Sequence, residues 1–288
     1  MASNTAAAGD DARRQLMLSL HKLASSLETP NDTIHRFAHQ NLQSAAVRVQ
    51  TSNCLIAGRL GSLLRYCLAL LPSNPLILKR TGYKNPSGEL HTAFQDGHKT
   101  PVHAFEYFAD HPEDLAHFNP YIELRRKSDL SWLSVYPVGE ETAGLEDPER
   151  ALFVNVGGGV GYQCAQFKER YPNVPGRVIL QDLPHSIVQS CRTPGVENTV
   201  HDFFQPQPVK GAKFYHMRGV LHNHPPHKVR KLLEHTKAAT APDSVLLADE
   251  MVLPEMGVNY DVASIDLTML GACASLERTE AQWREGGL

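Results

Sequence analysis

The chain has 288 residues, of which 42% are hydrophobic, and its formal net charge is −3 at pH 7. Because domains usually hold about 100 to 200 residues, this length predicts one sizeable hydrophobic core with a smaller accessory module. The slightly negative charge and the lack of a long Lys/Arg run exclude a nucleic acid held mainly by phosphate contacts. A small molecule or another protein is the expected partner.

The cysteines and the apolar stretches bear on the cellular compartment. The cysteines are odd in number, have no CxxC spacing and lie mostly in apolar stretches, where a free thiol behaves as a small hydrophobic group. They are Cys54, Cys67, Cys164, Cys191 and Cys273. The polar start is unlike a signal peptide, and the stretch 54–71 is interrupted by arginines and shorter than the roughly 20 residues of a membrane span. We therefore expect a reducing, cytoplasmic compartment and no membrane partner.

Two amphipathic helices are predicted near the start of the chain. Leucines at spacings of three and four indicate a helix over 11–28, and these are Leu16, Leu20, Leu23 and Leu27. A second helix is expected over 31–50, because Asn31 or Asp32 can cap its first N–H groups. We interpret residues 1–80 as a helical N-terminal region that serves oligomerisation, with a homodimer possible, or lines the substrate side.

Residues 81–140 are predicted to hold a linker followed by substrate-side helices. The stretch 72–101 is rich in Pro, Gly, Asn and His, which break regular structure, so we place the linker there. Helices are expected over 102–137. Aromatic residues in this stretch could sandwich a planar substrate, but at helical spacing they more often form core, so none is assigned to a site. They are Phe105, Tyr107, Phe108, Phe118, Tyr121 and Trp132.

The sequence pattern changes at Ala151, and residues 141–288 are predicted to form an α/β domain. Short β-branched runs end in turn residues and alternate with helical stretches, which is typical of a doubly wound parallel sheet. The five candidate strands are 152–158, 177–182, 199–203, 212–219 and 244–253.

A glycine-rich turn follows the first candidate strand. Gly157, Gly158, Gly159 and Gly161 precede a helical stretch, and glycine allows a ligand to approach the backbone closely, while a helix N-terminus offers free N–H groups. This indicates a nucleotide-like ligand. The pattern alone is weak, since it also introduces dinucleotides and occurs in tight turns without a ligand.

Acidic and aromatic residues at the next strand ends strengthen the ligand hypothesis. Asp182 ends the second strand, at the distance from the glycines where an acid accepts hydrogen bonds from ribose hydroxyls. Asp202 and Phe203 end the third strand, at the edge where open α/β sheets bind ligands. An adenine could stack on Phe203 and donate its amino group to Asp202.

Six motifs together resemble a known family. In order they are VNVGGGVGYQCAQF, GRVILQDLP, HDFF, RGVLH, ADEMVLP and LERTEAQW. They resemble the plant-type and fungal S-adenosylmethionine-dependent O-methyltransferases of secondary metabolism over residues 81–288, and more loosely over 28–50. The resemblance implies a Rossmann-like class I methyltransferase sheet with an N-terminal helical region. It also implies S-adenosyl-L-methionine as cofactor, bound by the glycine turn, Asp182, Asp202, Phe203 and Arg218, and a hydroxylated aromatic or polyketide-like metabolite as substrate.

The same resemblance points to a catalytic base. Methyl transfer from a sulfonium needs alignment and removal of the acceptor's proton, and a neutral histidine can take that proton at pH 7. His222 matches the family's general base, and Glu250 and Glu277 match two carboxylates that orient it. An isolated histidine at this position would more often be a polar cap of the next helix.

Some positions differ from the family. Asn155 stands where an Asp is usual, and Asn223 and His224 replace the usual Asp-Trp. Four histidines cluster here, which invites a metal hypothesis, but no HExxH or Cys/His ligand spacing is present, so we expect no metal. They are His216, His222, His224 and His227.

The chain is shorter than the family pattern. Residues 1–80 would hold an abbreviated dimerisation module, and the last strands of the methyltransferase sheet would follow the end of the sequence. We therefore expect an incomplete sheet whose strand 244–253 is an unpaired apolar edge, and a protein of reduced activity or one that needs a partner to complete the sheet.

Two other functions stay open. One is a methyltransferase fold that binds S-adenosylmethionine but promotes a rearrangement or cyclisation, or serves as a non-catalytic partner. The other, a nicotinamide-dependent oxidoreductase, lacks a hydride-transfer constellation.

Overall fold

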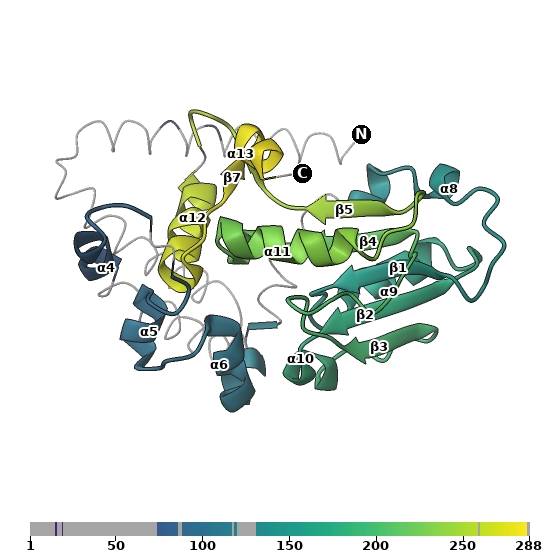
Figure 1. Cartoon of the computed structure of the whole chain (residues 1–288), viewed down its shortest axis with the longest axis horizontal. Coiled ribbons are helices and arrows are strands. Elements are labelled where there is room, and N and C mark those ends of the chain that lie inside the picture. Colours follow the sequence, from purple (N-terminus) through teal and green to yellow (C-terminus); the bar gives the residue numbers. More distant parts are fainter. Residues whose placement is uncertain are drawn as a thin grey trace. The chain divides into compact units, whose positions relative to one another are not determined.

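The computed structural model describes residues 15, 19, 74–85, 88–116, 118–119, 131–258 and 260–286. The chain divides into two compact units, 1–58 and 59–288. The predicted helices over 11–28 and 31–50 lie outside the described residues, except that Gln15 and Ser19 are helical. The domain boundaries at 80 and 140 stay predictions. All the strands of the described residues belong to the second unit (Figure 1).

Five parallel strands form the central sheet in the order β3-β2-β1-β4-β5. They are β1 (Ala151–Val156), β2 (Arg177–Asp182), β3 (Val196–Val200), β4 (Phe214–Arg218) and β5 (Val245–Asp249). The order reverses between β1 and β4, and such a reversal creates a crevice at the carboxyl ends of the strands. The predicted α/β class is confirmed, and among the described strands β5 pairs with β4 alone.

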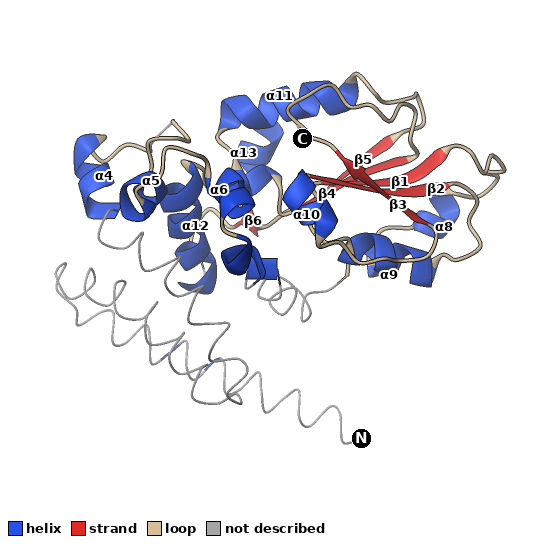
Figure 2. Ribbon diagram, turned by 90° about the horizontal axis from the view of Figure 1, so that it is seen from below, coloured by secondary structure: helices blue, strands red, loops and turns tan. Residues whose placement is uncertain are grey.

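Helices cover both faces of the sheet (Figure 2). Figure 2 shows α11 (Pro226–Lys237) on one face and α9 (Tyr162–Arg170) on the other. All six residues of β1 are buried, with Val154 and Val156 in the core under α11 and Leu152 and Phe153 in the core under α9. Burial on both faces explains why the strand sequences read as apolar runs rather than as alternating patterns.

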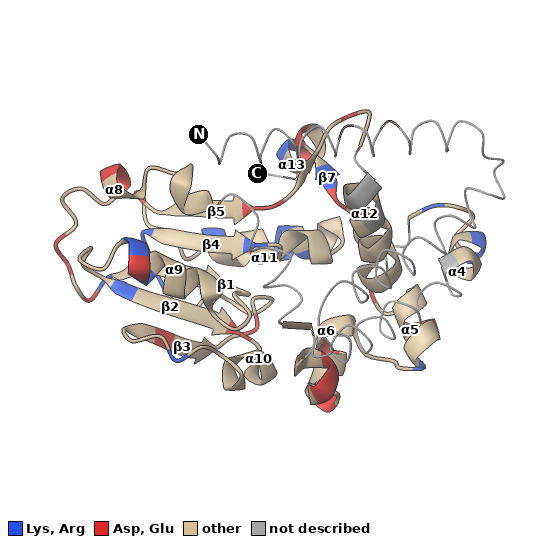
Figure 3. Cartoon of the chain, turned by 180° about the vertical axis from the view of Figure 1, so that it is seen from behind, with Lys and Arg blue, Asp and Glu red and all other residues tan. Residues whose placement is uncertain are grey.

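The shorter elements complete this part of the chain. They are α8 (Val138–Glu141), α10 (Pro184–Val188), α13 (Glu280–Glu285) and the 3₁₀ turns η1 (Trp132–Ser134) and η2 (Leu221–Asn223). Acidic residues mark the carboxyl ends of β2 and β5 (Figure 3). Within the described ranges, no helix has both the length and the apolar character of a membrane span.

Only the second strand has the predicted bounds, and the strand ends after β3 and β5 differ most in their consequences for the site. The third strand ends at Val200, because the Asp202 carboxylate accepts a hydrogen bond from the N–H of Phe204 and so forms a turn. Asp202 and Phe203 therefore lie in the following loop. The fifth strand ends at Asp249, and the chain then forms β6 (Val252–Leu253), which pairs with β7 (Arg278–Thr279) in a separate two-stranded sheet.

The linker predicted over 72–101 is wrong, because two helices lie in it. They are α4 (Asn74–Arg80) and α5 (Ala93–His98), and they are followed by α6 (Ala104–Asp110). Thr92 and Gln95 form a capping box at the start of α5, and Phe94 is fully buried. Thr92 also donates to the Ala272 carbonyl of α12 (Tyr260–Cys273), so this segment packs on the C-terminal part of the chain.

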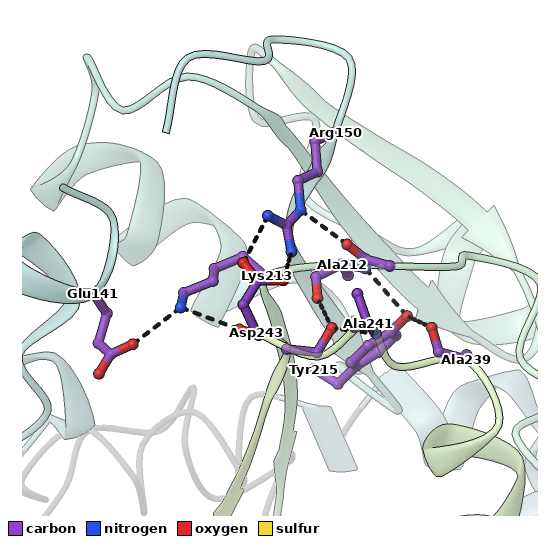
Figure 4. A network of polar contacts seen from close by, with 10 residues as sticks. Glu141, Arg150, Ala212, Lys213, Tyr215, Ala239, Ala241 and Asp243 are labelled. Atoms are coloured by element: carbon purple, nitrogen blue, oxygen red, sulfur yellow. Dashed lines mark hydrogen bonds and ion pairs between the residues drawn. The ribbon is translucent and has the colours of Figure 1, made fainter. Parts of the chain in front are cut away.

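A polar network joins the amino ends of the central strands (Figure 4). Arg150 binds both carboxylate oxygens of Asp243 at 2.8 Å and the Gly211 carbonyl at 2.9 Å. The buried ammonium of Lys213 contacts Glu141 at 3.0 Å and the Asp243 carbonyl at 3.1 Å. These contacts fix the starts of β1, β4 and β5, at the edge of the sheet opposite to the carboxyl ends of its strands.

Candidate active site

The glycine turn after β1 is shaped partly by packing and partly by open space. A β-carbon on Gly157 would lie 2.9 Å from Val220 and 3.2 Å from Phe203, and one on Gly158 would lie 2.3 Å from the amide nitrogen of Asn155. Gly159 has φ of +61° and nothing within 4 Å of an added β-carbon. The first two glycines are therefore required by their neighbours, whereas Gly159 faces room for a ligand.

Asp182 ends β2 beside this turn. Its carboxylate accepts hydrogen bonds from the N–H groups of Gly159 and Leu183, both at 2.7 Å. Burial raises the pKa of Asp182, and these two backbone hydrogen bonds oppose that rise. A carboxylate offers about four lone-pair positions, so the group still has acceptor capacity for hydroxyls. The structure thus brings Asp182 and the glycine turn together, as the sequence predicts.

The other expected ligand-binding residues lie in the loop after β3 and at the end of β4. Phe203 packs next to the position a Gly157 β-carbon would occupy, and its ring meets the Phe204 ring edge-on at 4.8 Å. Asp202 caps its own turn through the N–H of Phe204. Arg218 ends β4 and forms an ion pair with Asp249, with Nε and Oδ2 3.2 Å apart. The Arg218 side chain is nine-tenths buried at the carboxyl edge of the sheet.

His222 lies on η2, directly after β4, and is 9% exposed. Its Nδ1 is 2.6 Å from Oε1 of Glu277, whose side chain is fully buried. Because an ionised carboxylate only accepts, Nδ1 carries the hydrogen, and Nε2 presents a lone pair. No hydrogen bond from a described residue reaches Nε2. This tautomer is the one that a general base requires.

The turn that carries His222 is clamped by two further side chains. Oε1 of Glu250 accepts from the N–H groups of Val220 and Leu221 at 2.9 and 2.7 Å. Arg278 donates to the carbonyls of Leu221 and His224 at 3.2 and 2.9 Å. Glu250 was expected to flank the histidine, and in the structure it holds the backbone of the turn instead of the ring.

Burial shifts both clamping groups toward their neutral forms. It raises the pKa of Glu250, with the two backbone N–H groups, and His222 when its ring is protonated, opposing the rise. It lowers the pKa of Arg278, with Glu250 and Glu277 opposing that change.

Sequence reasoning missed Arg278, although it stands next to Glu277 in the LERTE motif. It also missed Asp266 on α12, whose carboxylate accepts the N–H of Glu277 at 2.8 Å.

The residues that depart from the family pattern have local partners. Asn155 is 1% exposed, and its Oδ1 lies 3.2 Å from Nδ1 of His216 on the adjacent strand. His224 is 5% exposed, and its ring lies 5.4 Å from the Phe203 ring. Burial lowers the pKa of His224 well below its usual range, so this ring is neutral at pH 7. No group of three or more His, Cys, Asp or Glu side chains in the described part is arranged to hold a metal ion.

Comparison with known proteins assigns this chain to one family. Residues 93–286 match the model of the O-methyltransferase domain. The chain belongs to this O-methyltransferase family. The demethylsterigmatocystin 6-O-methyltransferase of Aspergillus parasiticus is 34% identical over 217 residues, which make up 75% of this chain and 55% of the relative. The chain thus spans about half the length of the curated relatives it matches.

Solved structures agree with the fold. The LepI complex with SAM superposes with a TM-score of 0.76 at 28% identity, covering 99% of this chain and 93% of that one. A structure described as a pericyclic reaction enzyme also has a TM-score of 0.76, at 27% identity, covering 95% and 87%. The resemblance drawn from the six motifs and the α/β methyltransferase fold are therefore confirmed.

Proposed function

We propose that this protein transfers a methyl group from S-adenosyl-L-methionine to a hydroxyl of an aromatic or polyketide-like secondary metabolite, with His222 as general base. The observation that carries this proposal is the buried His222–Glu277 pair at the carboxyl edge of the sheet, 2.6 Å between nitrogen and oxygen. The relatives named as O-methyltransferases, which act on fungal metabolites such as demethylsterigmatocystin, support the same chemistry.

The residues around the glycine turn fit the cofactor. The open space at Gly159 gives room for the amino-acid part and ribose of the cofactor, and the Asp182 carboxylate beside it can accept ribose hydroxyls. Phe203 offers a ring face for adenine, Asp202 precedes it in the same loop, and Arg218 ends β4. The site would thus consist of Gly157, Gly158, Gly159, Asp182, Asp202, Phe203 and Arg218. When bound, the cofactor supplies an electrophilic methyl group.

The base and its partner would act on the acceptor's proton. A phenol has a pKa of about 10, so at pH 7 it keeps its proton until a base removes it. Nε2 of His222 takes that proton as the oxygen attacks. The Glu277 carboxylate then stabilises the resulting imidazolium, because a hydrogen bond to a charged group contributes about 1.5–3 kcal/mol. Glu250 and Arg278 keep the turn in place throughout.

The experiment separates cofactor binding from turnover. Calorimetry with S-adenosylmethionine and with NAD is carried out on the wild-type protein and on His222→Ala. Turnover is followed by mass spectrometry with demethylsterigmatocystin and with metabolite extracts from cells that lack the gene. We expect binding of S-adenosylmethionine but not NAD by both proteins, and a 10²–10⁴-fold loss of turnover in the variant, roughly the contribution of general-base catalysis. Methylation by His222→Ala at the wild-type rate would remove His222 from the mechanism.

The cellular setting is part of the proposal. We place the protein in the cytoplasm, as a homodimer acting on a small molecule. Fluorescence localisation and sedimentation of the purified chain test these two points. An organellar signal contradicts the first, and a monomer or a higher oligomer contradicts the second.

A second function is favoured by one observation, the likeness to a structure described as a pericyclic reaction enzyme. Here the protein would bind S-adenosylmethionine and promote a rearrangement or cyclisation, or serve as a non-catalytic partner. The product's mass decides between the two enzymatic functions. A product heavier than its precursor by one CH₂ unit supports methyl transfer, whereas an isomer formed without consumption of the cofactor supports the second function.

A further inference from the structure

Two buried glutamine side chains pair with each other between β2 and the loop after β3. They belong to Gln181 and Gln207, which are 0% and 2% exposed. Nε2 of Gln181 donates to Oε1 of Gln207 at 2.9 Å, and Nε2 of Gln207 donates to Oε1 of Gln181 at 2.8 Å. Oε1 of Gln207 also accepts the N–H of Val209 at 3.1 Å. Each amide thus gives and receives a hydrogen bond, which offsets the cost of burying the two polar groups.

The loop after β3 is attached to β2 at two points. At the start of the loop, the N–H of His201 donates to the Asp182 carbonyl at 3.0 Å. Further along, the amide pair attaches Gln207 to the side chain of Gln181. Because Gln181 and Asp182 are adjacent at the end of β2, both ends of the segment 202–206 are held by one strand. Attachment at both ends leaves the segment fewer conformations than attachment at one end alone.

Gln181 also binds the glycine turn, through its backbone. Its carbonyl oxygen accepts the N–H groups of Gly157 and Gly158 at 2.9 and 3.2 Å. The glycine turn and the loop meet at Phe203, because a β-carbon on Gly157 would lie 3.2 Å from the Phe203 ring. One residue of β2 is therefore bonded to both, to the turn through its carbonyl and to the loop through its side chain.

We propose that the Gln181–Gln207 pair positions the Phe203 ring for the adenine of S-adenosylmethionine. The inference rests on the cofactor residues of the proposed function, and it adds two positioning residues that act through the loop. The paired hydrogen bonds are directional, so they hold the loop in one arrangement that apolar side chains of similar size do not specify. A loop that keeps its binding arrangement for about a tenth of the time lowers the apparent affinity about 10-fold.

Methionine replacements separate positioning from packing. Methionine is unbranched like glutamine but has no amide to form the pair. Gln181→Met or Gln207→Met alone leaves the other amide buried and unpaired, so each single variant should unfold at a lower urea concentration than the wild type. The pair variant, which carries both replacements, should recover most of this loss, because exchanging both partners for apolar groups of similar shape is nearly neutral.

Calorimetry of the full chain with S-adenosylhomocysteine measures binding without turnover. We expect about 10-fold weaker affinity in both single variants and also in the pair variant, although the pair variant recovers its stability. Asp243→Asn is the control, because Asp243 binds Arg150 at the opposite edge of the sheet and its loss lowers stability away from the loop. The affinity of this control should stay within about two-fold of the wild type.

A second comparison tests whether the pair acts through Phe203. Phe203→Leu removes the ring face proposed for adenine, and it should weaken binding about 10-fold, as the loss of one base–aromatic stack does. Adding Gln207→Met to Phe203→Leu should then lower the affinity by less than about two-fold, because the loop no longer carries the ring that the pair positions.

Each outcome has one meaning. Weak binding by a stable pair variant, normal binding by Asp243→Asn and no further loss in the Phe203→Leu background support the inference. It is overturned if the pair variant binds within about two-fold of the wild type, or if the losses from Gln207→Met and Phe203→Leu are additive. Wild-type affinity in Phe203→Leu, or no binding by the wild type, also overturns it. The expected binding pattern without any methylated product contradicts the proposed function and leaves the positioning role standing.

Discussion

The glycine turn offers a prediction whose magnitude is set by the structure. Gly158→Ala places a β-carbon 2.3 Å from Asn155 Nδ2, 2.6 Å from Asn155 Cγ and 2.6 Å from Leu180 Cδ1. Asn155 and Leu180 are buried, at 1% and 0% exposure, so neither can move aside freely. Overpacking of this kind costs typically about 1–3 kcal/mol, and we expect about 3 kcal/mol here because two side chains must shift.

Gly159→Ala is the matched control. Its β-carbon meets nothing within 4 Å, but φ is +61°. The left-handed backbone costs an alanine about 1–2 kcal/mol, and the reduced freedom of the unfolded chain returns about 0.4–1 kcal/mol, which leaves about 1 kcal/mol. We therefore expect Gly158→Ala to be the more destabilised variant, whereas in Gly159→Ala the added methyl group occupies ligand space and weakens cofactor binding.

Urea unfolding followed by tryptophan fluorescence measures the two costs. Trp132 is a suitable reporter, because its ring stacks on Phe153 of β1 with 5.6 Å between centroids. Calorimetry with S-adenosylmethionine gives the affinities. The reasoning is refuted if Gly158→Ala unfolds within about 0.5 kcal/mol of the wild type, the range of a neutral surface substitution. It is also refuted if Gly159→Ala is the less stable of the two.

Three further predictions concern the site and the scaffold. Glu277→Gln should lower kcat by roughly 10³-fold with cofactor affinity within about two-fold of wild type, because it loses the charge that stabilises the imidazolium; an unchanged kcat contradicts this. Asp243→Asn should lower the free energy of unfolding by about 0.5–1 kcal/mol at pH 7. Hydrogen bonds from Arg150 lower the pKa of Asp243 from 3.8, so this stabilisation is present above pH 3.8 and is lost as the pH falls through the lowered pKa. Urea unfolding of the wild type and of Asp243→Asn across pH checks this loss. A difference between their free energies of unfolding that stays constant down to the lowest pH with folded protein contradicts it. Burial raises the pKa of Cys164 and Cys273 to about 12, so iodoacetamide at pH 8 should leave both unmodified in the folded protein, and peptide mass mapping that finds them alkylated as fast as in urea is the contrary result.

Much of the sheet could be predicted from the sequence because its signals are local. The strands β1, β2 and β4 are apolar runs buried on both faces, and each ends at or next to a glycine or an acid. The boundaries that failed depend on side-chain contacts instead. β3 ends where Asp202 caps its own turn, and β5 ends before Glu250, whose carboxylate binds the turn after β4. The periodicity of hydrophobic residues cannot predict such a contact.

The candidate site shows the same division. The glycines, Asp182 and His222 stand in motifs whose spacing is readable, and the structure places them at one edge of the sheet. The roles of Glu250 and Arg278 could not be predicted from the sequence, because both side chains bind backbone groups that are far away in sequence. The helix α5 was missed because the Pro, Gly, Asn and His content of the stretch was given more weight than the Thr92–Gln95 capping box at its start.

The contacts around β6 and β7 place the partner of His222 on other elements than the residues proposed to bind the cofactor. Glu277 directly precedes β7, which pairs with β6, and Arg278 of β7 lies 4.8 Å from the Trp283 ring of α13. Trp283 in turn donates to the Met251 carbonyl at 3.2 Å, just before β6. The glycine turn and Asp182, in contrast, rest on β1 and β2. Because Glu277, the partner of the proposed base His222, adjoins a small sheet outside the central one, damage to the β6–β7 pair should impair the proposed proton removal while the residues proposed to bind the cofactor keep their places.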